Sequence, residues 1–240
     1  MKKMIVTALA AVTLCSCAAA ENDAVKTSAP VKNDPRPIVV IDPGHGGEDG
    51  GGVAVDGTPE KGLNLDMALK LSDMLSICGY NTVMTRTEDV SIYDPGTVGL
   101  RKQKLSDMEN RLALFNTEDA VCISIHQNRF TDPKYSGAQM FYHKENAEGG
   151  RLAECLRERV RGDLQPDNER ETKAMDDELF LLCNCRNPAV MAECGFISNP
   201  EEAAKLERED YRRKMAFALF SGLNDYHIDS GRLEGRGGNG

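Results

Sequence analysis

The chain has 240 residues, a formal net charge of −9 at pH 7, 40% hydrophobic residues and 28% charged residues. This length supports one sizeable hydrophobic core and favours a single domain. The negative charge argues against binding to nucleic acid or to anionic lipid. The absence of Trp and an aromatic content of only 5% argue against an aromatic platform for sugars or bases.

The first residues have the pattern of an export signal. Two lysines precede an apolar run that ends at Leu14, and small residues follow. This pattern is typical of a secretory signal peptide, and the run is too short to cross a bilayer comfortably. The stretch LCSC at 14–17 resembles a bacterial lipobox. It predicts a lipoprotein signal peptide over residues 1–16 and a lipid on Cys17, with ordinary secretion as the alternative.

The segments that flank the main part of the chain differ from it in composition. Residues 18–37 are rich in Ala, Pro, Asn and Lys, which predicts a tether. Residues 38–227 are predicted to form the folded domain, and the glycine-rich residues 228–240 a disordered tail. We therefore expect a protein outside the cytoplasm, anchored by its lipid to the outer face of the bacterial cytoplasmic membrane and touching the membrane only there, or else secreted.

The hydrophobic pattern alternates between strands and helices. It predicts strands at 38–41, 80–85, 120–125, 137–142, 179–182 and 189–193. It predicts helices at 63–78, 101–115, 150–161 and 200–226. Such alternation indicates an α/β fold, here a single domain with a mostly parallel, twisted sheet of about six strands and helices on both faces. The polar residues 165–178 lack periodicity and are predicted to form a loop.

The predicted domain contains six cysteines: Cys78, Cys122, Cys155, Cys183, Cys185 and Cys194. An even number in an exported protein permits three disulfides. However, Cys78, Cys122 and Cys155 occupy apolar positions of predicted core elements, which favours free thiols that act as small hydrophobic side chains. Cys183 and Cys185 lack the spacing of a structural zinc site.

Polar side chains follow three of the predicted strands. His45 lies in IDPGHGG after the first strand, His126 follows CISI, and Glu193 follows AVMA. Ligand sites of open α/β sheets form where strands end at their carboxyl edge. We therefore expect these three side chains to lie close together.

A fourth residue, Glu60, would complete the ligand set of a catalytic zinc ion, because two imidazoles and one carboxylate leave a coordination position open. Zinc lowers the pKa of water and polarises carbonyl oxygens, and Glu193 would then act as the general base. Each residue also has an ordinary explanation. His45 could be a hydrogen-bonded loop residue, and Glu60 could favour a helix N-terminus. Glu193 is harder to explain in this way, because burying an unpaired carboxylate is costly.

Five segments carry a resemblance to a known family: IVVIDPGHGGEDGG, TPEKGLNLDMALKL, CISIHQN, SGAQMFY and PAVMAECGFISNPEEA. They resemble, in order, the zinc-dependent N-acetylmuramoyl-L-alanine amidases of catalytic type 3. The resemblance implies one Zn²⁺ ion bound by His45, Glu60 and His126, with Glu193 as the catalytic glutamate. It also implies hydrolysis of the amide between the lactyl group of N-acetylmuramic acid and L-alanine in peptidoglycan.

Within that family, the segments ECGF with NPEE and SGAQMFYHKENAEGGRLAE look like those of amidases that prepare the spore cortex. Those enzymes act with a deacetylase partner to form muramic δ-lactam, although amidases of the vegetative wall share most of these features. One departure is Cys183, where family members often carry Arg or Lys; here Arg186 follows three residues later. We expect this difference to affect substrate preference rather than hydrolysis.

Two alternatives remain. A zinc-dependent wall peptidase or amino-sugar deacetylase would keep the metal but cleave another bond, and the order of the motifs argues against it. A membrane-tethered, non-catalytic wall-binding module would keep only the fold. Such a module usually lacks a ligand or the glutamate, and this chain has all four residues.

Overall fold

The structure, a computed structural model, describes residues 38–230. The predicted signal peptide, the lipid on Cys17 and the tether therefore lie outside the described residues, as does the predicted tail from residue 231 onward. The last helix continues to Asp229, so the first two residues of the predicted tail are helical. No helix within 38–230 is both long enough and apolar enough to cross a membrane.

Strands and helices alternate along most of the described chain. The strands are β1 (Ile38–Pro43), β2 (Asn81–Met84), β3 (Ala120–Asn128), β4 (Gln139–His143), β5 (Lys173–Met175) and β6 (Ala189–Phe196). The helices are α1 (Glu60–Ile77), α2 (Leu100–Phe115), α3 (Ala147–Asp163), α4 (Phe180–Asn184), α5 (Pro200–Leu206) and α6 (Glu209–Asp229).

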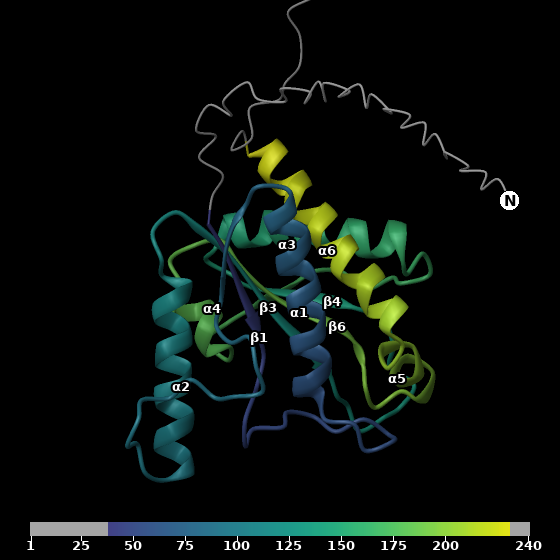
Figure 1. The fold of residues 1–240 in the computed structure, drawn as a ribbon. Helices are drawn as coiled ribbons and strands as arrows, with labels where there is room; N and C mark the ends of the chain where they lie inside the picture. The colour runs from purple at the N-terminus through teal and green to yellow at the C-terminus, as the bar shows by residue number, and fades with distance from the viewer. Residues whose placement is uncertain (1–37, 231–240) are drawn as a thin grey trace, which may run out of the picture. The chain divides into compact units, whose positions relative to one another are not determined.

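All of these strands join one six-stranded sheet in the order β2-β1-β3-β6-β4-β5. The strands β2, β1, β3 and β6 are parallel, whereas β4 is antiparallel to β6 and parallel to β5. Figure 1 shows α1 and α6 lying side by side over the sheet. The predicted fold class, a single α/β domain with a mostly parallel sheet, is confirmed.

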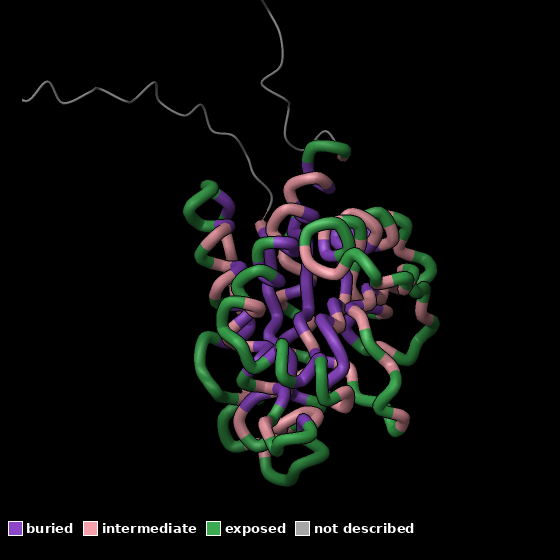
Figure 2. Tube along the Cα trace, turned by 90° about the vertical axis from the view of Figure 1, so that its right-hand side faces the viewer, coloured by how far each residue is buried: buried purple, intermediate pink, exposed green. Residues whose placement is uncertain are grey.

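Alternate residues of the central strands divide the core into two layers. Val39 and Ile41 of β1 pack in the layer that contains α1, α3 and α6, whereas Val40 packs in the layer of α2 and α4. All three side chains are fully buried, as in strands that are covered on both faces. Each such burial contributes about 1.5–3 kcal/mol. The buried segments in Figure 2 accordingly run through the middle of the trace.

The predicted strand at 179–182 is wrong. Phe180–Asn184 form the short helix α4, and the strand β5 (Lys173–Met175) lies in the segment predicted to be a loop. A short apolar run fits a buried helical turn as well as a strand, and Leu181 and Leu182 pack into the layer of α2. β5 is a partly exposed edge strand beside β4, so it lacks the hydrophobic pattern of a buried strand.

Cys122, Cys155, Cys183, Cys185 and Cys194 are free thiols. Cys122 and Cys194 are buried, in agreement with a role as small hydrophobic side chains. The predicted core position of Cys78 is wrong. The helix α1 ends at Ile77, and Cys78 is exposed. Cys183 lies within α4 rather than after a strand.

Candidate active site

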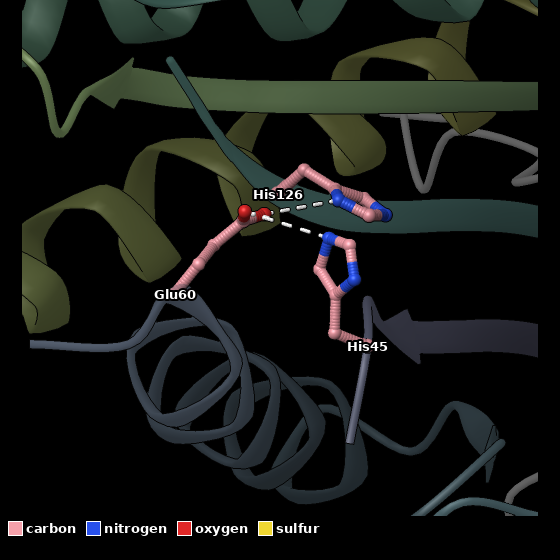
Figure 3. A group of neighbouring side chains, drawn as sticks. All are labelled: His45, Glu60 and His126. Carbon is pink, nitrogen blue, oxygen red and sulfur yellow. Dashed lines mark hydrogen bonds and ion pairs between the residues drawn. The ribbon is translucent and has the colours of Figure 1, made fainter. Parts of the chain in front are cut away.

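Three side chains of ligand type converge at the carboxyl edge of the sheet. One ligand atom each of His45, Glu60 and His126 lies within 4.8 Å of the other two, and residues 38–230 hold no other such group of His, Cys, Asp and Glu. Nε2 of His45 is 3.4 Å from Oε2 of Glu60, and Nδ1 of His126 is 3.0 Å from Oε1. Figure 3 shows the carboxylate facing both imidazoles.

Each of these side chains is supplied by a different element. His45 follows β1, Glu60 is the first residue of α1, and His126 lies near the end of β3. Because β1 and β3 are paired and parallel, the two imidazoles reach the same edge of the sheet. The start of α1 then brings the carboxylate to them, as the sequence predicts.

The turn after β1 is tightly shaped around His45. This residue has φ 62°, and the following Gly46 and Gly47 also have positive φ. The left-handed conformation costs a residue with a side chain about 1–2 kcal/mol, so other contacts must hold His45 in place. Gly44 is required for a different reason: a Cβ atom there would lie 2.2 Å from ring atoms of His126.

We expect Gly44→Ala to lower the affinity for a bound metal ion by at least about tenfold, the scale of changes next to metal ligands, because the added methyl group displaces the His126 ring. Competition with a chromophoric chelator measures this affinity. Gly62→Ala is the matched control, since nothing lies within 4 Å of its Cβ position in α1. Equal affinities of the two variants would show that His126 tolerates the displacement.

Glu60 is the centre of a hydrogen-bond network. Its buried carboxylate accepts hydrogen bonds from the backbone N–H groups of Gly52 (2.8 Å) and Gln127 (2.9 Å) and from the side chain of Asn64 (3.1 Å). Burial alone would raise its pKa, but His126 and His45 hold the pKa of Glu60 far below its ordinary value. Glu60 is therefore ionised, as a metal ligand must be.

A second carboxylate, Asp49, lies beside His45 and was not predicted from the sequence. Its Oδ1 is 3.1 Å from Nδ1 of His45, which leaves Nε2 on the side of Glu60. Burial alone would lower the pKa of His45, but Glu60 and Asp49 raise it. A carboxylate on one ring nitrogen orients the imidazole and fixes the tautomer that binds metal through the other. The pair of acidic residues after GHGG, of which Asp49 is the second, was the available signal in the sequence.

Glu193 lies beside this group, since it pairs with His126 in the register of β3 and β6. Its Oε2 atom is buried and has no hydrogen-bond partner among the described residues. Burial raises the pKa of Glu193 to about 7; smaller effects come from His126, which lowers this pKa, and from Glu60, which raises it. A carboxyl group poised near neutral pH in such surroundings is typical of a functional site. The structure thus brings all four predicted side chains to one place.

The three converging residues fit a divalent metal ion. Two imidazole nitrogens and one ionised carboxylate are a donor set that suits zinc and related transition metals. The unpartnered oxygen of Glu193 is a polar group that otherwise lacks a reason to be buried here.

A buried ion pair supports the turn. Nη1 of Arg111 is 2.5 Å from Oδ1 of Asp42, the residue three positions before His45. Asp42 also accepts hydrogen bonds of 2.6 Å from the hydroxyls of Thr85 and Ser124. Burial alone would raise its pKa, but Arg111 and the two hydroxyls hold the pKa of Asp42 below its ordinary value of 3.8. Its contribution to stability is therefore present above pH 3.8 and is lost as the pH falls through the lowered pKa.

We expect Asp42→Asn to lower the free energy of unfolding by about 3 kcal/mol at pH 7, because it removes one of the two carboxylates that pair with the buried Arg111. The difference from the unchanged protein should narrow below pH 3.8, where the native carboxylate also becomes protonated. Urea unfolding at pH 7, 5, 4 and 3 measures both effects. A difference that stays constant over this range would contradict a folded-state pKa below the ordinary value.

A cavity of about 870 Å³ in the described part of the chain is lined by none of the four candidate site residues. Its lining includes Tyr135, Gln165, Arg170 and Tyr211. Nη1 of Arg170 donates to the side chain of Gln139 at 3.1 Å, and Gln139 pairs with Glu193 in the sheet. The lining residue Arg170 is therefore linked to Glu193 through Gln139.

Comparisons with known proteins agree with this site. The model of the family described as N-acetylmuramoyl-L-alanine amidase matches residues 39–225. The germination-specific N-acetylmuramoyl-L-alanine amidase of Bacillus subtilis (strain 168) is 36% identical over 196 residues, which are 81% of this chain and 81% of that protein.

Solved structures show the same likeness. The CwlD amidase from Clostridioides difficile, in complex with the GerS lipoprotein, matches with a TM-score of 0.77 and 34% identity over 80% of this chain and 99% of that chain. An N-acetylmuramoyl-L-alanine amidase from Clostridium difficile 630 matches with a TM-score of 0.68 and 28% identity over 81% of this chain and 97% of that chain. The chain therefore belongs to the N-acetylmuramoyl-L-alanine amidase family of cell-wall hydrolases, and it resembles the amidases of the spore cortex.

Proposed function

We propose that the protein is a zinc-dependent peptidoglycan hydrolase that cleaves the amide bond between N-acetylmuramic acid and the L-alanine of the stem peptide. In this proposal His45, Glu60 and His126 bind the zinc ion, and Glu193 is the catalytic residue. The observation that carries the proposal is the convergence of the three ligand atoms within 4.8 Å beside a buried carboxyl oxygen that lacks a partner.

The proposed zinc ion and Glu193 would have different roles in the reaction. When bound, zinc would act as a Lewis acid on the lactyl carbonyl and lower the pKa of water. Glu193 accepts a proton from the attacking water and delivers it to the departing alanine nitrogen. Its pKa of about 7 suits both steps at neutral pH, because a group can then take up and release a proton with similar ease.

The direct test is digestion of purified peptidoglycan by the protein, with mass analysis of the released products. We expect free stem peptides that begin with L-alanine, and their loss when a chelator is added. Fragments cut within the stem peptide would indicate a peptidase, and released acetate a deacetylase. Binding to the wall without release of any product would support a non-catalytic wall-binding module.

The substrate we propose within the cell wall is the peptidoglycan of the spore cortex. The support is the likeness to the germination-specific amidase and to the CwlD amidase. The proposed reaction leaves N-acetylmuramic acid with a free lactyl carboxyl group. A partner deacetylase would then release acetate from the sugar nitrogen, and the freed amine would condense with this carboxyl group, with loss of water, to give muramic δ-lactam. Digestion of spore and vegetative peptidoglycan side by side, with and without an added deacetylase, measures the preference and whether δ-lactam forms.

We also propose that the protein works outside the cytoplasm and is held at the membrane by a lipid on Cys17. The motif at residues 14–17 supports the anchor, and the location of peptidoglycan supports the compartment. Mass spectrometry of the mature N-terminus distinguishes the lipidated form from the secreted one. The CwlD amidase binds a lipoprotein in its solved structure, and a lipoprotein partner is proposed here on that likeness.

A further inference from the structure

A buried arginine near His45 and Glu60 makes an unusual set of contacts. Arg86, two residues after β2, is 3% exposed. Its guanidinium donates hydrogen bonds of 2.9 Å to four backbone carbonyls, those of Pro43, Gly44, Lys61 and Glu88. No carboxylate within residues 38–230 forms an ion pair with it, whereas nearby Arg111 pairs with two.

This arrangement is a poor source of stability. Burying a cation costs free energy, and hydrogen bonds to neutral carbonyls offset less of that cost than an ion pair with a carboxylate does. Arg86 is therefore hard to explain as a device that merely strengthens the fold. The positions of its acceptors suggest a different purpose.

Two of the acceptors adjoin proposed metal ligands. The carbonyl of Gly44 directly precedes His45, and the carbonyl of Lys61 directly follows Glu60. Both accept from the same nitrogen, Nη2 of Arg86, each at 2.9 Å. The planar guanidinium of Arg86 thus connects the turn after β1 to the first turn of α1. These two segments belong to different secondary-structure elements.

The turn needs such support, because His45 has the left-handed φ of 62°. Arg111 contributes as well, since its Nη2 donates to the carbonyl of His45 at 2.8 Å. Arg86 differs from Arg111 in reaching both ligand-bearing segments. A methyl group on Gly46 would lie 2.9 Å from Cδ and Nε of Arg86, so the arginine also packs closely beneath the turn.

We propose that Arg86 is a positioning residue that sets the spacing of His45 and Glu60 for metal binding. It acts through the backbone on either side of these ligands and touches neither imidazole nor carboxylate. This inference rests on the proposed metal site. Lysine keeps the charge but lacks the planar fork of donors, so it cannot hold both segments in the same way.

The test is the zinc affinity of Arg86→Lys, prepared metal-free as the whole protein and measured by competition with a chromophoric chelator. We expect a loss of 10- to 100-fold, the range for groups that orient metal ligands, and a changed visible absorption spectrum of the cobalt-substituted protein. The free energy of unfolding of the metal-free protein is measured alongside, to separate ligand spacing from general destabilisation.

Arg212→Lys is the matched control. Arg212 also donates to two backbone carbonyls, those of Leu206 (2.8 Å) and Glu207 (2.6 Å), and it pairs with Asp66, which is not one of the converging residues. We expect this variant to lose stability but to keep its zinc affinity and cobalt spectrum. Arg86→Gln, which removes the buried charge, replaces Arg86→Lys if the latter does not fold, and the same loss of affinity is expected.

Three results would overturn the inference. Unchanged zinc affinity and cobalt spectrum in the Arg86 variants would leave Arg86 with a structural role only, while the proposed function would stand. Equal losses of zinc affinity in the Arg86 and Arg212 variants would show that the loss comes from general destabilisation of the protein. If the unchanged protein itself does not bind zinc, the proposed metal site fails and this inference fails with it.

Discussion

Replacing Glu193 by glutamine is expected to lower kcat by about 10²–10⁴-fold, the usual contribution of a general acid–base group, and to leave zinc affinity within a few-fold of its original value. The amide has nearly the same shape as the carboxyl group but cannot accept the proton. Zinc binding should persist because Glu193 is not one of the three converging residues. Release of L-alanine-terminated peptides measures turnover, and chelator competition measures affinity.

The pH profile gives an independent check on Glu193. Because a general base acts in its deprotonated form, activity should fall on the acid side of its pKa, which burial raises to about 7 in the metal-free site. A bound dication nearby favours the carboxylate, so the midpoint is expected at or below pH 7. Glu193→Gln should lose this acid limb. A variant that keeps both the limb and its turnover would assign the base to another residue.

Replacing Glu60 by glutamine is expected to lower zinc affinity by at least about 100-fold and to reduce activity to background. A neutral amide is a much poorer zinc ligand than an ionised carboxylate. The amide NH₂ would also face either the N–H of Gly52 or that of Gln127, which both donate to Glu60. We expect this conflict to cost about 1–3 kcal/mol of stability. Metal content after dialysis and the free energy of unfolding measure the two effects.

Glu202→Gln is the matched control for Glu60. Glu202 is also buried and accepts hydrogen bonds from two backbone N–H groups, those of Gly137 (2.9 Å) and Phe196 (2.8 Å). It is not part of the converging group. We expect a similar loss of stability without a loss of zinc. If Glu60→Gln retains zinc as well as Glu202→Gln does, Glu60 is not a ligand.

The sequence predicted the central strands well, and three of its candidate site residues, His45, Glu60 and His126, converge in the structure. The apolar, β-branched run of β1 predicts a strand that is buried on both faces, and the structure shows this alternation at Val39, Val40 and Ile41. His45 and His126 were recognisable because each follows such a run, and Glu193 because it ends another. These signals are local, since strand formation and burial depend on the pattern of neighbouring side chains.

The errors occurred where local pattern and tertiary contacts conflict. The apolar run that includes Leu181 and Leu182 is compatible with a strand, but packing against the layer of α2 makes it helical. The short strand β5 lies in a mostly polar segment and forms only because the edge of β4 provides its backbone hydrogen-bond partners. The antiparallel direction of β4 beside β6 likewise depends on contacts between residues far apart in the chain, and no local sequence pattern predicts it.

By itself the sequence determined the fold class, the family and the residue types that can hold a metal ion, because motifs and hydrophobic periodicity are written in short stretches. Only the tertiary structure decided how these residues are held. Asp49 beside His45, and Arg86 between the carbonyls of Gly44 and Lys61, depend on turns and on contacts between residues far apart in the chain. Charged side chains give no sign in sequence of whether they will be buried, because burial is decided by the segments that fold over them.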